Sequence, residues 1–245
     1  MKKRIQIKQL TSWSFSRYIT YKQCPRKAKL QYLDKIAEPP NQYMERGAEI
    51  HDQAEAYIKG KLKKLPADLQ LFKEEFDDLK ERYKKRLSMI VVEDTWAFTK
   101  DWDQTKWDDW VGCWVRIKLD CAYSLDDNET LVIIDWKTGK FRPESNADYV
   151  EQLELYALAA FIIYPHIETV RPYLVYTDNG MVYPDDEEEE LVFTRKDYGA
   201  LLKLWEKRVR PMMRDKTFAP RPNDKCCWCF YRSSNKANGG GQCEF

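Results

Sequence analysis

Three charged side chains in two neighbouring β-rich segments have the residue types and spacing to bind a divalent cation. Asp120 lies on the polar face of one segment, opposite the apolar face that residues 113, 115, 117, 119 and 121 are expected to share. Asp135 and Lys137 end the next segment, side by side because side chains two apart in a strand share a face. Charged groups beside the apolar run 131–134 cost several kcal/mol unless they are paired or bind a metal. A cation between Asp120 and Asp135 removes this cost, and oxygen ligands favour Mg²⁺ or Mn²⁺ over Zn²⁺.

Such a site supports the hydrolysis of phosphodiesters. The cation can acidify a water molecule and stabilise charge on the phosphate, while Lys137 orients the nucleophile or neutralises the developing charge. An isolated Asp-x-Lys pattern also fits a strand that merely ends in a polar turn, so the neighbouring segments decide between the two interpretations.

The spacing of apolar residues predicts the elements that position these groups. The period is helical in the first half of the chain and changes to two from about residue 89. Asp126, Asp127 and Asn128 supply a turn, which predicts an antiparallel hairpin between the strands that carry Asp120 and Asp135. Expected helices span about 14–33, bent at Pro25, then 44–59, 67–87, 146–164 and 195–213, and expected strands span 90–98, 113–123, 131–137, 169–177 and 190–194.

This order of elements predicts one α/β domain with a mixed central sheet flanked by helices. A chain of 245 residues with 43% hydrophobic residues can bury the core of such a domain. We expect a helical N-terminal part (1–88), a catalytic core (89–213) and a Cys-rich tail (214–245). No run of 18 apolar residues and no apolar secretory segment is present, so we expect a cytoplasmic protein with no membrane partner.

Several motifs follow one another along the chain: Ser14–Tyr18 with Gln23–Lys27, a G-x-x-x-H-x-x-x-E pattern over residues 47–55, Asp120, the segment Asp135-Trp136-Lys137-Thr138-Gly139, and Q-x-x-x-Y over residues 152–156. In these motifs and their order, the chain resembles the RecB-like branch of the PD-(D/E)xK nucleases. Leu119, which precedes Asp120, stands where the superfamily name has proline, and that proline is often absent in the superfamily.

The resemblance implies a restriction-endonuclease-like sandwich that cleaves DNA with Mg²⁺ or Mn²⁺. It implies that Asp120, Asp135 and the backbone carbonyl of Trp136 bind the metal, that His51 approaches it and that Lys137 is catalytic. It also implies that Gln152 and Tyr156 contact DNA and order the site. Helical spacing places Gln152 and Tyr156 on one helix face independently, as it does His51 and Glu55. A zinc site from His51 and Glu55 lacks the second histidine of H-E-x-x-H.

Seven cysteines without a secretory signal favour reduced thiols and metal ligation over disulfides. One N-terminal and three C-terminal cysteines resemble the 4Fe–4S ligands of AddB-type and CRISPR-associated RecB-like nucleases. The resemblance implies the ligands Cys24, Cys226, Cys229 and Cys243, with Cys227 as a spare. The thirteen residues between the last two ligands exceed the usual family interval, so a zinc ion or no metal are the alternatives. We expect Cys113 and Cys121 to be core residues.

The charge distribution predicts a phosphate-binding surface at the two ends of the chain, although the net charge is only +1. Residues 1–36 hold ten Lys and Arg against one acidic residue, and residues 195–236 hold twelve against four. Arg17, Arg26 and Lys27 are the candidate DNA contacts. We expect the acidic run 185–190 to be a solvated loop, and the tryptophans 102, 107 and 110 either stack on unpaired bases or pack internally.

The leading hypothesis is a DNA exonuclease that acts on single strands or ends, in recombination, repair or phage DNA processing in a bacterial or phage-infected cell. One alternative is a DNA-binding scaffold with a vestigial site and a functional cysteine-metal staple. A second is a sequence-specific endonuclease with the same chemistry. The sequence carries no helicase motif, so a helicase or recombination partner would have to separate the strands.

Overall fold

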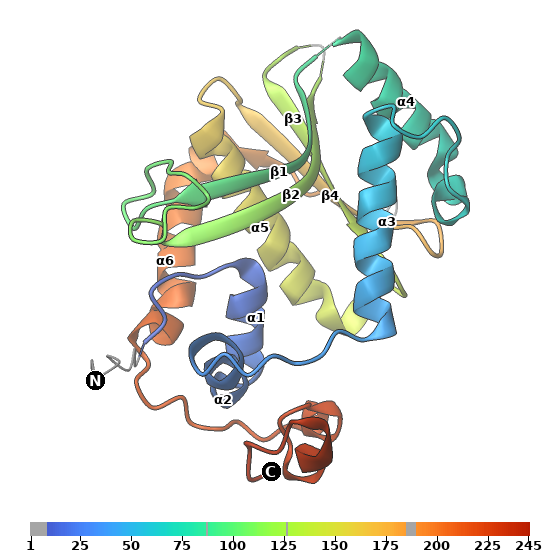
Figure 1. Ribbon diagram of the computed structural model, residues 1–245. Helices are drawn as coiled ribbons and strands as arrows, with labels where there is room; N and C mark the ends of the chain where they lie inside the picture. The colour runs from blue at the N-terminus through green and yellow to red at the C-terminus, as the bar shows by residue number, and fades with distance from the viewer. Residues whose placement is uncertain (1–8, 87, 126, 185–189) are drawn as a thin grey trace.

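Among the described residues, six strands form a mixed sheet at the centre of the protein (Figure 1). The computed structural model describes residues 9–86, 88–125, 127–184 and 190–245. Strands β3 and β4 run parallel, and the other described pairs are antiparallel. The spatial order is β1 (Ile90–Phe98), β2 (Val115–Ser124), β3 (Thr130–Lys137), β4 (Thr169–Tyr176) and β5 (Met181–Tyr183), with β6 (Phe193–Thr194) paired to β4.

Helices cover both faces of this sheet, which confirms the predicted α/β sandwich. On one face pack α3 (Gln42–Ile58), a 3₁₀ segment (Ala67–Phe72) and α4 (Lys73–Lys85). On the other pack α1 (Phe15–Gln23), α5 (Asn146–Ile163) and α6 (Tyr198–Arg214). No described helix is long and apolar enough to cross a membrane.

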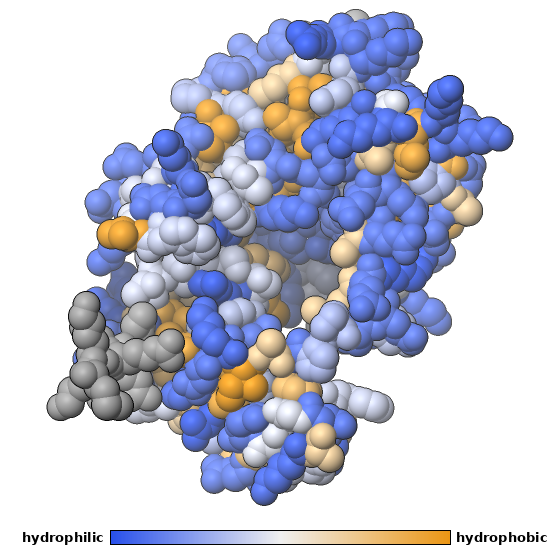
Figure 2. All heavy atoms as spheres, in the orientation of Figure 1, coloured by the Kyte–Doolittle hydropathy of each residue, from blue (hydrophilic) through white to orange (hydrophobic). Residues whose placement is uncertain are grey.

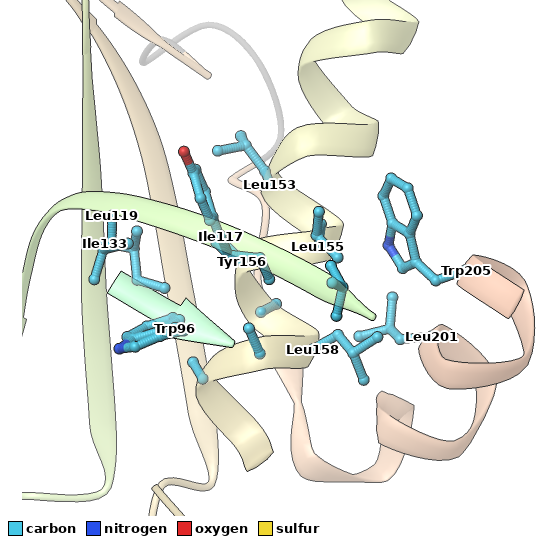
Figure 3. Packing of buried hydrophobic residues seen from close by; sticks show 14 of the residues in the cluster. Trp96, Ile117, Leu119, Ile133, Leu153, Leu155, Tyr156, Leu158, Leu201 and Trp205 are labelled. Carbon is cyan, nitrogen blue, oxygen red and sulfur yellow. The ribbon is translucent and has the colours of Figure 1, made fainter. Parts of the chain in front are cut away.

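Helix α5 is buried along most of its length, and this burial fixes the side chains that it directs at the sheet. Residues 157–161 are all buried, and in Figure 3 Leu155 and Leu158 lie on the side of α5 that packs toward Leu201 and Trp205 of α6. Each buried leucine contributes roughly 1.5–3 kcal/mol of transfer free energy. The helix therefore holds Gln152 and Tyr156 in a set orientation.

Two of the predicted helices are interrupted. The helix expected over 14–33 stops at Cys24, whose backbone is extended (φ −157°), and resumes as a short helix at Pro25 because proline suits a first helical position. The helix expected over 67–87 begins as 3₁₀ turns, and α4 ends at Lys85. Residue 87, residue 126 of the expected turn and residues 185–189 of the acidic run lie outside the described residues.

The pairing of β1 with β2 is interrupted where the candidate site lies. Val92 pairs with Cys121 and Asp94 with Leu119, but Glu93 is in the left-handed region (φ 54°) and pairs with no residue of β2. Leu119 packs against α5, whereas Cys121 packs on the opposite face of the sheet. The expectation that residues 113, 115, 117, 119 and 121 share one face was therefore wrong at Cys121, because the strand changes face at Asp120.

Candidate metal-dependent active site

One nitrogen and two carboxylates gather where α3 meets β1 and β2. The ligand atoms of His51, Glu93 and Asp120 all lie within 4.8 Å of one another. His51 Nδ1 is 3.2 Å from Asp120 Oδ1 and 3.4 Å from Glu93 Oε1, and Lys118 Nζ is 2.6 Å from Glu93 Oε2. In Figure 2 this face of the molecule is hollowed between α1 and α3.

Each member of this cluster is positioned by a different element. His51 is on α3, and its ring packs edge-on against the indole of Trp136, with the ring centres 6.4 Å apart. The backbone N–H of Trp136 donates to Asp120 Oδ2 at 2.8 Å, which joins β2 to β3 beyond their ladder. Glu93 owes its direction to a left-handed backbone that costs a non-glycine residue of order 1–3 kcal/mol, and such strain is concentrated at functional sites.

A second group of side chains surrounds Asp135 on the neighbouring strand. Gln152 Nε2 donates to Asp135 Oδ1 at 2.9 Å, and the Tyr156 hydroxyl donates to the same oxygen. Lys137 Nζ forms an ion pair with Asp135 Oδ2 and donates to Gln152 Oε1 at 3.1 Å. Gln152 Nε2 also donates to the Tyr156 hydroxyl oxygen at 2.9 Å. Strand β3 and helix α5 thus hold one connected polar network.

The electrostatics of the two groups are coupled. Burial and the charge of Asp135 raise the pKa of Asp120 from 3.8 to about 6, although His51 and Lys137 act in the opposite direction. Burial lowers the pKa of His51, but hydrogen bonds to Asp120 and Glu93 outweigh it and raise that pKa to about 10. At neutral pH and without metal, the His51 imidazolium is therefore the cation that lies between the two carboxylates.

The donor set fits a divalent cation. Glu93 Oε1 and Asp135 Oδ2 are buried, and the cationic side chains of His51 and Lys137 lie beside them as ion-pair partners. Buried carboxylates require a cationic partner, a role that a divalent cation can also fill. Two or three carboxylates with one imidazole suit Mn²⁺ and, less closely, Mg²⁺.

Most of the predicted site residues converge here, and one additional residue joins them. Asp120, Asp135, Lys137, Gln152 and Tyr156 all belong to the two groups, and His51 contacts Asp120. Glu55 lies outside both groups and forms an ion pair with Lys59 at 2.7 Å. Our reading of the sequence missed Glu93. Its signal was an acidic residue within the strand Ile90–Phe98, opposite Asp120 once the two strands are paired.

Four cysteines line one pocket between the short helix at Pro25 and the C-terminal tail. They are the predicted Cys24, Cys226, Cys229 and Cys243. The backbone N–H groups of Arg221 and Asn223 donate to the sulfur atoms of the first two, at 3.5 and 3.3 Å.

The remaining cysteines differ from these four. The Cys227 thiol is exposed and donates to the Asp224 carbonyl at 2.9 Å. Cys113 and Cys121 are buried in the sheet, as expected. Among the described residues, no three thiols lie within 4.8 Å of one another.

The described parts of the two basic ends, residues 9–36 and 195–236, lie side by side (Figure 1). Tyr231 donates to the Ile36 carbonyl at 2.7 Å, and Asn223 Nδ2 donates to the Gln23 carbonyl at 3.2 Å. Of the candidate DNA contacts, Arg26 and Lys27 line the cysteine pocket. Arg17 is half-buried and bonds to Ser12, with its guanidinium 5.1 Å from the ring centre of Tyr32.

The three tryptophans of the β1–β2 loop have different environments. Trp102 is buried against Trp13 and Phe98, so for this residue internal packing is the correct alternative. Trp107 and Trp110 are 39% and 82% exposed, and the Arg116 guanidinium lies 5.8 and 5.0 Å from their ring centres.

Comparison with protein families gives a match over most of the chain. Residues 12–234 match the family model of the PD-(D/E)XK nuclease superfamily. Comparison with curated protein sequences gives no match. Among solved structures, one similar chain is a protein from Eubacterium rectale described as a predicted exonuclease, with a TM-score of 0.47 and 11% identity over 93% of this chain and 88% of that chain.

Proposed function

The chain belongs to the PD-(D/E)XK nuclease superfamily, and from this membership we propose that it is a Mn²⁺- or Mg²⁺-dependent DNA exonuclease of the RecB-like branch. The observation that carries the proposal is the cluster of His51, Glu93 and Asp120 beside the network of Asp135 and Lys137. The proposed metal ligands are Asp120, Asp135, His51 and the Trp136 carbonyl, as predicted, with Glu93 as an addition.

The chain's own residues prepare the site for a phosphodiester. When bound, a divalent cation supplies Lewis acidity, which makes a water molecule more acidic and offsets charge on the phosphate. His51 must release its proton before its nitrogen can act as a ligand, since Nδ1 now faces the same carboxylates. Gln152 and Tyr156 keep Asp135 Oδ1 directed into the site by two hydrogen bonds.

Lys137 is the proposed catalytic residue. Its ammonium contacts Asp135 and Gln152, so it stays at the edge of the cluster with part of its surface open to a substrate (28% side-chain exposure). From this position it can orient the attacking water or neutralise negative charge that develops on the phosphate oxygens.

A preference for single strands or ends follows from the surroundings of β2. Trp110 presents an exposed ring with Arg116 beside it, and Lys118 continues the same strand toward Asp120. Exposed aromatic rings beside cations are the usual contacts for unpaired bases. Such a substrate requires a strand-separating partner or a resected end.

The proposed occupant of the cysteine pocket is a 4Fe–4S cluster, with a zinc ion or no metal as the alternatives. Four thiolates suit such a cluster, although zinc also accepts four thiolate ligands. Hydrogen bonds from backbone N–H groups to Cys24 and Cys226 are typical of thiolate ligands. A cluster would join the two basic ends of the chain.

Cleavage of end-labelled DNA tests the proposed activity. With Mn²⁺, the wild type should release nucleotides from linear DNA and leave circular single strands intact, whereas Asp135→Asn and Lys137→Ala should lose the activity. Lys73→Ala is a matched control, because Lys73 pairs with Asp77 on the exposed side of α4. Equal activity in Lys137→Ala would reject the assignment, and cleavage of circles would indicate an endonuclease.

A further inference from the structure

A groove of about 620 Å³ lies where α3 ends, α4 ends and β1 begins. Its apolar lining comes from Ile58, Tyr83, Met89 and Ile90. Its charged lining is entirely cationic, with no acidic residue of the described chain among the residues that face it. The cations are Lys59, Lys80, Lys84 and Arg86.

Two of these cations are engaged within the protein and two are open. Lys59 pairs with Glu55, and Lys80 lies 3.7 Å from the ring centre of Tyr57 and donates to the Leu62 carbonyl at 2.8 Å. Lys84 and Arg86 are exposed and have no ion-pair partner in the part of the chain that the structure describes. The adjoining loop adds three exposed lysines, at positions 61, 63 and 64.

Two separate elements relate this groove to the metal cluster. Ile58 follows His51 by seven residues along α3, which is about 10 Å at 1.5 Å per residue. Ile90 precedes Glu93 by three residues along β1, again about 10 Å at roughly 3.3 Å per residue. Both paths place the near end of the groove about 10 Å from the cluster.

We propose that this groove binds the phosphate backbone of the DNA substrate, about three nucleotides from the phosphodiester that is cut. A strand of B-form DNA advances 3.4 Å per nucleotide, so a distance of about 10 Å corresponds to roughly three phosphates. This inference rests on the proposed function for the identity of the polyanion. It adds a surface that the charge pattern of the two chain ends did not predict.

A phosphate backbone fits the groove better than an acidic protein segment does. Phosphates require many cations with little demand on side-chain geometry, and flexible lysines supply this contact without sequence specificity. The groove also begins on α3 and β1, which carry His51 and Glu93, so a strand bound at the cluster has a short path to it. An acidic peptide would gain nothing from this proximity.

The test is the salt dependence of DNA binding by the full-length Lys84→Ala/Arg86→Asn variant. Asparagine is chosen because Arg86 has a left-handed backbone (φ 51°) that asparagine tolerates. Binding of a fluorescent 20-nucleotide oligonucleotide is measured with Ca²⁺ in place of Mn²⁺, between 50 and 200 mM KCl. The matched control is Lys73→Ala/Lys85→Ala, which removes the same charge from two lysines that pair with Asp77 and Glu81.

Loss of two phosphate contacts to this single strand should reduce the slope of log K against log salt by about 1.4. The weakening relative to wild type should then shrink about 7-fold between 50 and 200 mM KCl, and the control should follow the wild type. In cleavage assays the variant should raise KM and leave kcat within about twofold, because these residues lie outside the cluster.

An unchanged slope with normal KM would overturn the proposal and leave the groove to an acidic protein partner. Absence of cleavage in the wild type would instead reject the proposed function, while the binding measurement would still report on the groove. The two failures are therefore distinguishable.

Discussion

Replacement of Asp120 by asparagine should stabilise the metal-free protein while it abolishes cleavage. Asp120 is 4% exposed, and burial and the charge of Asp135 raise its pKa from 3.8 to about 6. Each pKa unit corresponds to 1.36 kcal/mol, so the ionised carboxylate costs the folded protein about 3 kcal/mol. Asparagine keeps the shape and an acceptor for the Trp136 N–H but carries no charge.

The pH dependence of this effect follows from the direction of the shift. Below pH 3.8 the carboxyl is protonated in both folded and unfolded states, and Asp120 costs nothing. The cost develops as the pH rises toward 6 and is complete above it. The free energy of unfolding of Asp120→Asn should therefore exceed that of the wild type by about 3 kcal/mol at pH 8 and by about half of that at pH 5.

Urea denaturation in EDTA, followed by tryptophan fluorescence, measures this difference. Asp215→Asn is the matched control with the opposite sign, since hydrogen bonds from Phe218, Thr217 and Tyr21 outweigh burial and lower the pKa of Asp215. The Asp215→Asn variant should have a lower free energy of unfolding than the wild type at pH 8. This difference should disappear as the pH falls through the pKa of Asp215 in the folded protein. The reasoning would be refuted if the Asp120→Asn variant had no higher free energy of unfolding than the wild type at pH 8. It would also be refuted if the difference in free energy of unfolding were the same at pH 5 and pH 8.

The other predictions concern single groups around the site and the tail. Glu93→Gln should weaken Mn²⁺ binding about 10- to 100-fold in calorimetry, and wild-type affinity would exclude Glu93 as a ligand. Tyr156→Phe removes a hydrogen bond to a carboxylate, worth about 1.5–3 kcal/mol, so kcat should fall about 10- to 150-fold. Cys24→Ser should lose bound iron while Cys227→Ser retains it, and equal metal content in both variants would contradict the ligand assignment. Trp110→Ala should lower single-strand affinity about 5- to 150-fold and leave duplex affinity unchanged.

The sequence predicted the site to the extent that local periodicity determines it. Asp135 and Lys137 are two apart in a strand, and Gln152 and Tyr156 are four apart in a helix, so each pair faces one direction whatever surrounds it. The order of the strands and helices then required an α/β sandwich, which the structure confirms.

Glu93 could not be found in this way because its role depends on pairing and on backbone conformation. Its strand was predicted with the correct bounds, but only the register of β1 on β2 brings it opposite Asp120. The left-handed φ of Glu93 and the change of face between Leu119 and Cys121 both break the period of two. A prediction that side chains simply alternate between the two faces of a strand therefore assigns the wrong face beyond this irregularity.

The break at Cys24 has a similar origin. The apolar period continues from Ser14 to Leu33 and predicts one bent helix, yet an extended residue at Cys24 separates two helices. The extended backbone brings the Cys24 sulfur within reach of the Arg221 N–H, nearly two hundred residues later in the chain. Local patterns contain no information about such a distant partner.

The most direct test of the account is the position of a bound Mn²⁺ ion in a crystal of the wild-type protein. We expect anomalous density within about 2.0–2.4 Å of ligand atoms from His51, Glu93 and Asp120, with Asp135 or the Trp136 carbonyl completing the set. Mn²⁺ bound elsewhere on the protein, with His51 still between the two carboxylates, would contradict the proposed site.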